Sequence, residues 1–205
     1  MTRLGVVINL ETCKDQRGCM VACKREHNSF LGSHYVETFT AMDESFPRPN
    51  TYFIPILCQH CAHPSCVSAC ENEVFAKRED GIVTVGDTDA CETCASKACV
   101  KACPYHAIDL DPLTGKIGKC DLCASRIDAG EAPACMLDCC SNSWFVGDLD
   151  DPESIVSQIV RDWGEHAHQL KPETGNAPSV YYLLHTSEWR DMDNLYSPAW
   201  HNDQK

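Results

Sequence analysis

The 205-residue sequence predicts an α+β fold in which short strands and short helices surround four cysteine-rich motifs. Sixteen cysteines gather in four groups, short apolar segments flank those groups, and no cysteine follows residue 140. Hydrophobic residues, cysteine included, make up 43% of the chain and aromatic residues only 8%, so we expect small cores rather than one deep core. Metal binding can supply the missing stability, because a site absent from the unfolded chain adds its binding free energy to folding.

The short apolar segments beside the cysteine groups predict the strands. They cover residues 4–8, 52–57, 81–85, 107–110 and 144–146. Asp80-Gly81 is a turn signal between residues 74–78 and 82–85, and residues 111–115 are a second turn signal between residues 107–110 and 116–119. Residues 24–57, which contain Pro47 and Pro49, are predicted to form a polar connector.

Helices are predicted to begin within or just after the motifs, over residues 18–26, 65–70, 97–102 and 121–129. A later helix begins with Asp151 as N-cap and Pro152 at its first position. Its apolar residues recur at helical spacing: Ile155, Val156, Ile159, Val160 and Trp163. Beyond Pro172 we expect extended chain, with a docking strand over residues 180–184. The last stretch, with Trp189, Tyr196 and Trp200, is predicted to be a tail that lies on a partner, since few local contacts could hold it.

The cysteine spacing suits metal binding better than disulfides. The groups are Cys13/Cys19/Cys23, Cys58/Cys61/Cys66/Cys70, Cys91/Cys94/Cys99/Cys103 and Cys120/Cys123/Cys135/Cys139, with Cys140 beside the last. Secreted disulfide scaffolds are usually shorter and carry a signal peptide. This N-terminus has neither a long apolar segment nor paired arginines.

Iron–sulfur clusters fit the spacing better than zinc. Zinc sites often use two C-x2-C pairs that lie twelve or more residues apart. Here three residues separate the last two cysteines of every motif: Cys19/Cys23, Cys66/Cys70, Cys99/Cys103 and Cys135/Cys139. Bacterial ferredoxins contain this half in the run C-x2-C-x2-C-x3-C-P. A zinc-stabilised interaction module stays as the alternative from another functional class.

The ferredoxin spacing also explains how two motifs share two clusters. Three close cysteines surround one cluster, whereas the fourth ligates the other cluster of the module. Cys103-Pro104 has the trailing proline of ferredoxins, whereas Cys70-Glu71 and Cys23-Lys24 do not. The second and third motifs are also two residues longer in the middle. These departures predict a specialised relative of ferredoxin.

The net charge of −13 makes nucleic acid a poor partner, because an acidic chain repels phosphate. No stretch approaches the roughly 20 apolar residues that span a bilayer, so we expect no direct membrane insertion. We expect a soluble protein that is cytoplasmic, or exported only with a signal-bearing partner. The sequence contains neither a glycine-rich phosphate loop nor a nucleophile–base arrangement, so no catalytic residues are predicted.

The order of the motifs resembles the four-cluster electron-transfer subunits of the dimethyl sulfoxide reductase family. Cys120-Asp-Leu-Cys123, eleven residues and Cys135-Met-Leu-Asp-Cys139 are similar to their fourth motif, and Cys58 to Cys70 is similar to their second. Lys171-Pro-Glu-Thr-Gly175 and the following Pro178-Ser-Val-Tyr-Tyr-Leu183 resemble their C-terminal segment. The resemblance implies nested ferredoxin-like modules: an outer one over 1–57 and 104–150, an inner one over 58–103, and a C-terminal helix and partner-docking tail over 151–205.

The same resemblance implies the ligand sets. Cluster one has Cys13, Cys19 and Cys139; cluster two has Cys120, Cys123, Cys135 and Cys23; cluster three has Cys58, Cys61, Cys66 and Cys103; cluster four has Cys91, Cys94, Cys99 and Cys70. The implied role is to relay single electrons to or from a molybdenum- or tungsten-pterin catalytic subunit of an anaerobic oxidoreductase. A membrane anchor or a soluble redox partner could complete the complex. The alternative within this class is an iron–sulfur subunit of a hydrogenase or formate-oxidising complex.

Cluster one lacks a cysteine, because Gln16 occupies the second ligand position of the first motif. An amide is a poor substitute for a thiolate. Similar ferredoxins that lose this cysteine hold a 3Fe-4S cluster, or a 4Fe-4S cluster whose odd iron has another ligand. Both outcomes stay open, with Asp15, Gln16, Cys140 or water as the substitute, and complete loss of the cluster is a third.

Overall fold

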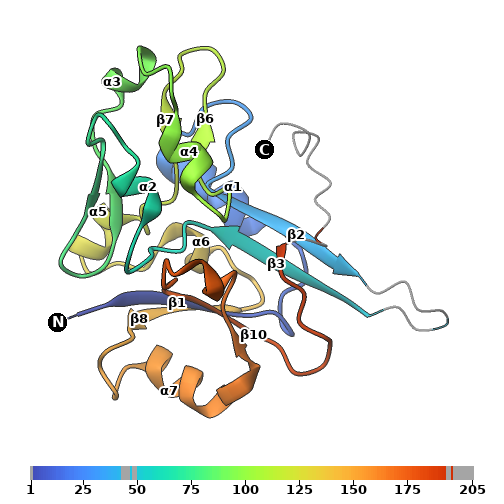
Figure 1. The fold of residues 1–205 in the computed structure, drawn as a ribbon. Helices are drawn as coiled ribbons and strands as arrows, with labels where there is room; N and C mark the ends of the chain where they lie inside the picture. The colour runs from blue at the N-terminus through green and yellow to red at the C-terminus, as the bar shows by residue number, and fades with distance from the viewer. Residues whose placement is uncertain (1, 43–46, 48–49, 193–194, 196–205) are drawn as a thin grey trace.

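A computed structural model describes residues 2–42, 47, 50–192 and 195 (Figure 1). Its largest sheet has the strand order β8-β1-β10-β9, made of Trp144–Asp148, Leu4–Asn9, Val180–Leu183 and Ala167–His168. β1 runs antiparallel to β8 and parallel to β10, so the two ends of the described chain meet at the centre of this sheet. Strand β1 was predicted from the apolar run at residues 4–8, and the structure confirms it.

Different elements pack on the two faces of this sheet. Val7 points to the side where helix α7, Ile155–Trp163, packs through the buried Val156. Val6 and Ile8 point to the opposite side and join the main core, which also contains most of the cysteines. The alternation follows from the two-residue period of a strand. In Figure 1, α7 lies below the sheet and the short helices of the cysteine motifs lie above it.

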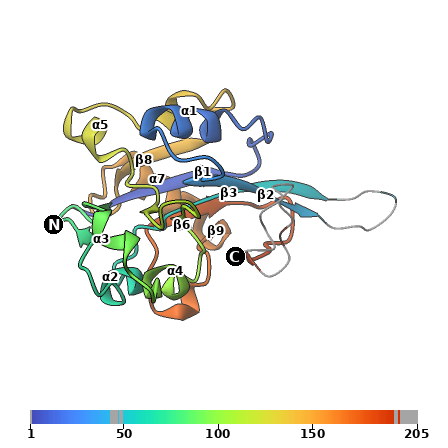
Figure 2. The same ribbon diagram turned by 90° about the horizontal axis from the view of Figure 1, so that it is seen from above.

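Three hairpins complete the strands. β4 and β5, Phe75–Lys77 and Val83–Val85, and β6 and β7, Asp109–Leu110 and Ile117–Gly118, form at the two predicted turns. The strand predicted over residues 52–57 is confirmed as part of β3, Thr51–Leu57, but the prediction that residues 24–57 form a polar connector was wrong. Within these residues, β2, Val36–Met42, pairs along its whole length with β3. This hairpin projects from the body of the molecule in Figure 2.

The helices of the motifs pack in pairs. α1, Gly18–His27, contacts α6, Ala134–Leu137, and α2, Ser65–Ser68, contacts α4, Ala98–Ala102. The structure confirms the predicted helices at α1, α2, α4 and α5, Ala124–Asp128, each within a few residues. It adds α6 and the single turn α3, Asp89–Glu92, which the sequence did not predict.

The segment after residue 150 corrects two expectations. The N-cap of α7 is Ser154, because Asp151 forms a turn in which it accepts hydrogen bonds from the backbone N–H groups of Glu153 and Ser154. The predicted docking strand is β10, and it docks on β1 of its own chain. Two single turns of 3-10 helix, Gly164–His166 and Pro172–Thr174, flank β9.

The start of the predicted partner-docking tail also packs on its own chain. Trp189 stacks on His168 with ring centroids 4.7 Å apart, and the Tyr52 hydroxyl donates to the Glu188 carbonyl at 3.0 Å. Few local contacts were expected here, and that expectation was wrong for residues 185–192. Tyr196 and Trp200 lie outside the described residues.

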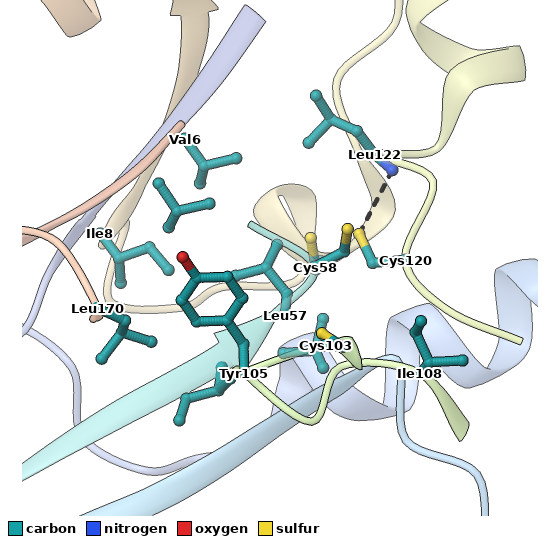
Figure 3. Packing of buried hydrophobic residues seen from close by; sticks show 14 of the residues in the cluster. Val6, Ile8, Leu57, Cys58, Cys103, Tyr105, Ile108, Cys120, Leu122 and Leu170 are labelled. Atoms are coloured by element: carbon teal, nitrogen blue, oxygen red, sulfur yellow. Dashed lines mark hydrogen bonds between the residues drawn. The ribbon is translucent and has the colours of Figure 1, made fainter. Parts of the chain in front are cut away.

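The main core mixes cysteines with aliphatic and aromatic side chains. Figure 3 shows Cys58, Cys103 and Cys120 among Leu57, Tyr105 and Ile108. Within the described part of the chain, no helix has the length and apolar character needed to cross a membrane.

Candidate functional site

Three of the four motifs begin with the same kinked loop. The third residue of each adopts a left-handed backbone conformation, with φ of 51° at Asp15, 44° at His60 and 58° at Leu122. This kink turns backbone N–H groups toward the first cysteine: Leu122 N–H donates to Cys120 Sγ at 3.3 Å, and Asp15 N–H donates to Cys13. Hydrogen bonds of this kind stabilise a thiolate.

The last cysteine of three motifs is also held by the backbone. Val74 N–H donates to Cys70 Sγ and Ser143 N–H donates to Cys139 Sγ, each at 3.4 Å, and Ala107 N–H donates to Cys103. In each case the donor lies four residues after the cysteine. The motifs therefore repeat in structure as well as in spacing.

The structure brings together the cysteines of each predicted set. We name the sets sites one to four: site one is Cys13, Cys19 and Cys139; site two is Cys23, Cys120, Cys123 and Cys135; site three is Cys58, Cys61, Cys66 and Cys103; site four is Cys70, Cys91, Cys94 and Cys99. The four cysteines of site two line one cavity, and the four of site three line another. At the other sites the cysteines lie close enough to raise one another's pKa. Beyond the effect of burial, Cys13 and Cys139 raise the pKa of Cys19, and Cys70 raises the pKa of Cys91 and of Cys99.

Crowding and burial make these thiols hard to ionise without a bound cation. Burial, reinforced by the neighbouring cysteines, raises the pKa of Cys61 and of Cys66 to about 12. The same causes raise the pKa of Cys23 to about 12, and burial raises the pKa of Cys120 well above its usual value. Metal ions bind thiolates, so such a site releases protons when it is filled. Four cysteines around a cavity fit an iron–sulfur cluster.

Sites two and three differ from sites one and four in exposure. All eight cysteines of sites two and three are buried. At site four Cys70 and Cys94 are partly exposed, and at site one Cys13 and Cys139 are. Hydrogen bonds from the Ser96 hydroxyl and the Lys97 N–H lower the pKa of Cys94, so this thiol ionises more easily than its buried counterparts.

The position of the missing ligand is filled by two side chains. Cys140 Sγ donates a hydrogen bond to Gln16 Oε1, so the sixteenth cysteine reaches the first motif across 124 residues of sequence. Asp15, the other predicted substitute, forms a double hydrogen bond with Arg17 at 3.0 and 3.1 Å. The structure thus brings Cys140 and Gln16 together and turns the Asp15 carboxylate toward an arginine.

The four sites follow one another in space. Cys19 and Cys23 lie on α1, and the remaining cysteines of the C-x3-C pairs lie on or just after α2, α4 and α6. Four residues are about one helical turn, a rise of roughly 6 Å. These helices therefore join site one to site two and site three to site four. Cys120 and Cys58, side by side in Figure 3, join site two to site three.

Polar side chains support the two buried sites. His60 Nδ1 accepts the Val83 N–H at 3.0 Å, which leaves the ring hydrogen on Nε2, 3.9 Å from Cys120 Sγ. The buried Lys119 lines site three and donates to the carbonyls of Val83 and of Cys120, the latter at 2.9 Å. Both residues lie next to a motif cysteine in the sequence, His60 before Cys61 and Lys119 before Cys120.

Other supporting residues were missed by sequence reasoning. His27 Nε2 lies 3.3 Å from Cys123 Sγ and 3.6 Å from Asp121, on the rim of site two. Lys77 Nζ donates to the Cys61 carbonyl at 2.8 Å, and the Tyr105 hydroxyl donates to the Cys61 sulfur. Lys97 donates to the carbonyls of Cys91 and Gly115 at site four. Only Lys97 and Tyr105 had a sequence signal, their position inside or beside a motif.

Comparison with known proteins agrees with this arrangement. Residues 49–149 match the 4Fe-4S dicluster domain family. The chain is 34% identical to the B subunit of tetrathionate reductase from Salmonella typhimurium, over 88% of this chain and 72% of that protein. It is 35% identical to the B subunit of sulfite dehydrogenase from Allochromatium vinosum, over 89% and 83%, and 31% identical to the arsenate respiratory reductase iron–sulfur subunit of a Shewanella species, over 88% and 96%. The chain therefore belongs to the iron–sulfur electron-transfer subunits of the dimethyl sulfoxide reductase family of molybdopterin oxidoreductases.

Proposed function

We propose that this subunit holds four iron–sulfur clusters, at sites one to four, and relays single electrons between a molybdenum- or tungsten-pterin catalytic subunit and a second redox partner. The observation that carries the proposal is the unbroken succession of the four cysteine sets. Clusters bound there would accept and release one electron at a time, which is the chemistry that the protein itself cannot supply.

The cysteine sets predicted from the family are proposed as the ligands. Two findings support them: the cavities of sites two and three are each lined by the expected four cysteines, and every expected set is in proximity. The packing of α1 on α6 and of α2 on α4 supports the nested modules, an outer one over 1–57 and 104–150 and an inner one over 58–103.

Different residues would hold the clusters and set their reduction potentials. Buried cysteines and the apolar core exclude water from sites two and three, which lowers the local dielectric and strengthens every nearby charge. Lys119 and Lys77 place positive charge beside site three and favour an added electron there. His60 offers its Nε2 hydrogen toward Cys120, between sites two and three.

A catalytic partner is proposed because the relatives are named as subunits of reductases and dehydrogenases that act on different compounds. The substrate would then be chosen by the partner, while this chain supplies the same electron path. The hydrogenase or formate-oxidising alternative has no support among these relatives.

Anaerobic purification with copurifying subunits tests the proposal. We expect brown protein that dithionite bleaches, with about fifteen or sixteen irons and about sixteen sulfides per chain, and a large partner that contains molybdenum or tungsten. Colourless protein with zinc and no acid-labile sulfide would reject the electron-transfer role. Nickel in the partner would favour a hydrogenase.

A further inference from the structure

Two departures from the motif pattern occur at the same site. The first motif is the one that lacks a cysteine, at Gln16, and the fourth motif is the one with an extra cysteine, Cys140. These two motifs supply the three cysteines of site one. A loss and a gain of the same chemical group at one site suggest that the second compensates for the first.

The backbone at Gln16 retains the shape of a ligand loop. Gln16 follows the left-handed Asp15 just as Cys61 follows His60 and Cys123 follows Leu122. The side chain of residue 16 is therefore presented where the other motifs present a thiolate. The loop is intact, and what site one lacks is the sulfur.

The Cys140 sulfur lies beside the side chain of residue 16. Cys140 directly follows Cys139, which belongs to site one, and its Sγ contacts the amide oxygen of Gln16. Cys140 is exposed, and Cys13 and Cys139 of the same site are partly exposed, so site one lies at the surface of the described chain. Asp15 competes less well, since both its carboxylate oxygens accept hydrogen bonds from Arg17.

We propose that the Cys140 thiolate is the fourth ligand of site one, which then holds a 4Fe-4S cluster rather than a 3Fe-4S cluster. The inference rests on the proposed function. On iron binding, the Cys140 thiol loses its proton to solvent and a sulfur–iron bond replaces the sulfur–hydrogen bond. The sulfur leaves the Gln16 amide oxygen when it binds iron, so Gln16 is not a ligand.

Iron content and the EPR spectrum of the oxidised complex test the ligand. Wild type should contain about sixteen irons and give no EPR signal, because oxidised 4Fe-4S clusters are diamagnetic. Cys140→Ala should lose about one iron per chain and gain the signal of an oxidised 3Fe-4S cluster. The double variant Gln16→Cys, Cys140→Ala should regain the iron and lose the signal. Gln16→Ala is the matched control and should keep both wild-type properties.

Thiol labelling gives an independent readout. Fifteen of the sixteen cysteines are the three conventional ligands of site one and the full sets of the other three sites. Cys140 is the sixteenth. In the intact complex a maleimide should therefore leave Cys140 unlabelled, and it should label Cys140 once the clusters are removed.

The outcomes separate this inference from the proposed function. Unchanged iron and spectrum in Cys140→Ala, rapid labelling of Cys140 in the intact complex, or iron loss in Gln16→Ala would each overturn the assignment of Cys140 while the relay stands. Wild-type protein without iron and sulfide would overturn the relay itself.

Discussion

The two middle sites and the two end sites are built from the same motifs but sit in different environments. Every cysteine of sites two and three is buried, whereas sites one and four each have two partly exposed cysteines. The buried pair lies between the sheet and the short helices, where Val6 and Trp144 help to line site two. In the proposed relay, burial would protect the interior of the path, and exposure at its ends would let electrons enter and leave. The difference would then reflect the positions of the sites along one path.

The largest expected effect comes from removing one ligand at each kind of site. Cys120→Ser should remove the cluster of site two, interrupt the path and destabilise the core, because it leaves a polar group in a buried cavity that no longer holds metal. Each kcal/mol of lost folding free energy lowers the unfolding midpoint of a chain of this size by roughly 2–4 °C. Cys94→Ser, at the open site four, should lower the midpoint less, because Cys94 is partly exposed and the serine hydroxyl there can bind water. Iron analysis and thermal unfolding measure both.

Equal destabilisation by the two substitutions would contradict the distinction between middle and end sites. Iron is measured separately for each variant. A fall of about four irons identifies the loss of a whole cluster.

The order of cluster loss should show the same distinction without a mutation. An iron chelator added with a mild oxidant should attack sites one and four first, because reagents reach partly exposed ligands more easily than buried ones. Thiol labelling followed by mass spectrometry should therefore detect Cys13 and Cys94 before Cys58 and Cys120. Simultaneous appearance of all four would mean that the protein loses its clusters only by global unfolding.

A smaller effect is expected from the charge beside site three. Lys119→Met removes a buried positive charge near Cys66 and Cys103 and replaces lysine with a side chain of similar volume. The cluster there should therefore become harder to reduce. The reduction potential should fall by on the order of 100 mV, the size of a unit charge at roughly 6 Å in an effective dielectric constant near 20. Lys101→Met, an exposed lysine on α4, is the control and should shift the potential much less. Potentiometric EPR titration compares them, and equal shifts would show that burial does not amplify the charge.

Covalent spacing constrains which cysteines share one motif, whereas the pairing of the first motif with the fourth and of the second with the third came from the family resemblance. Cys19 and Cys23 are one helical turn apart wherever their helix packs, so two neighbouring sites follow from the spacing alone. The lysines and histidines that support the sites come from distant parts of the chain, as His27 does for Cys123 and Lys77 for Cys61. Their proximity depends on tertiary packing, which spacing does not encode.

The missed elements have a similar explanation. The hairpin of β2 and β3 has a long connection that contains Pro47 and Pro49, and the sequence signal for a hairpin depends on a short turn. The pairing of β10 with β1 joins residues more than 170 positions apart, as in Val6 with Val180. A local pattern could identify the strand at residues 180–184 but not its partner.

The smallest expected effect concerns His60, at the junction of the two buried sites. Burial, with Lys119 and Lys77 nearby, lowers its pKa well below the usual value, so the ring stays neutral in the folded protein. The unfolded chain binds a proton below pH ~6.5 whereas the folded protein does not, so this residue makes folding stability fall as the pH drops through that value. Because the neutral ring does not titrate, the reduction potential of site two should be constant between about pH 6 and 8. A slope of ~59 mV per pH unit would mean that a proton accompanies the electron.

His60→Asn separates the two hydrogen bonds of this ring. The asparagine oxygen can replace Nδ1 as the acceptor for the Val83 N–H, but the hydrogen that Nε2 directs toward Cys120 is lost. Without that donor the reduced, more negative cluster at site two is less stabilised, so its potential should fall by a few tens of millivolts, about the free energy of one weak hydrogen bond. The potential of site four should stay unchanged in the same sample and serves as the internal control. If both potentials moved together, His60 would act on the fold as a whole and not on the junction between the two buried sites.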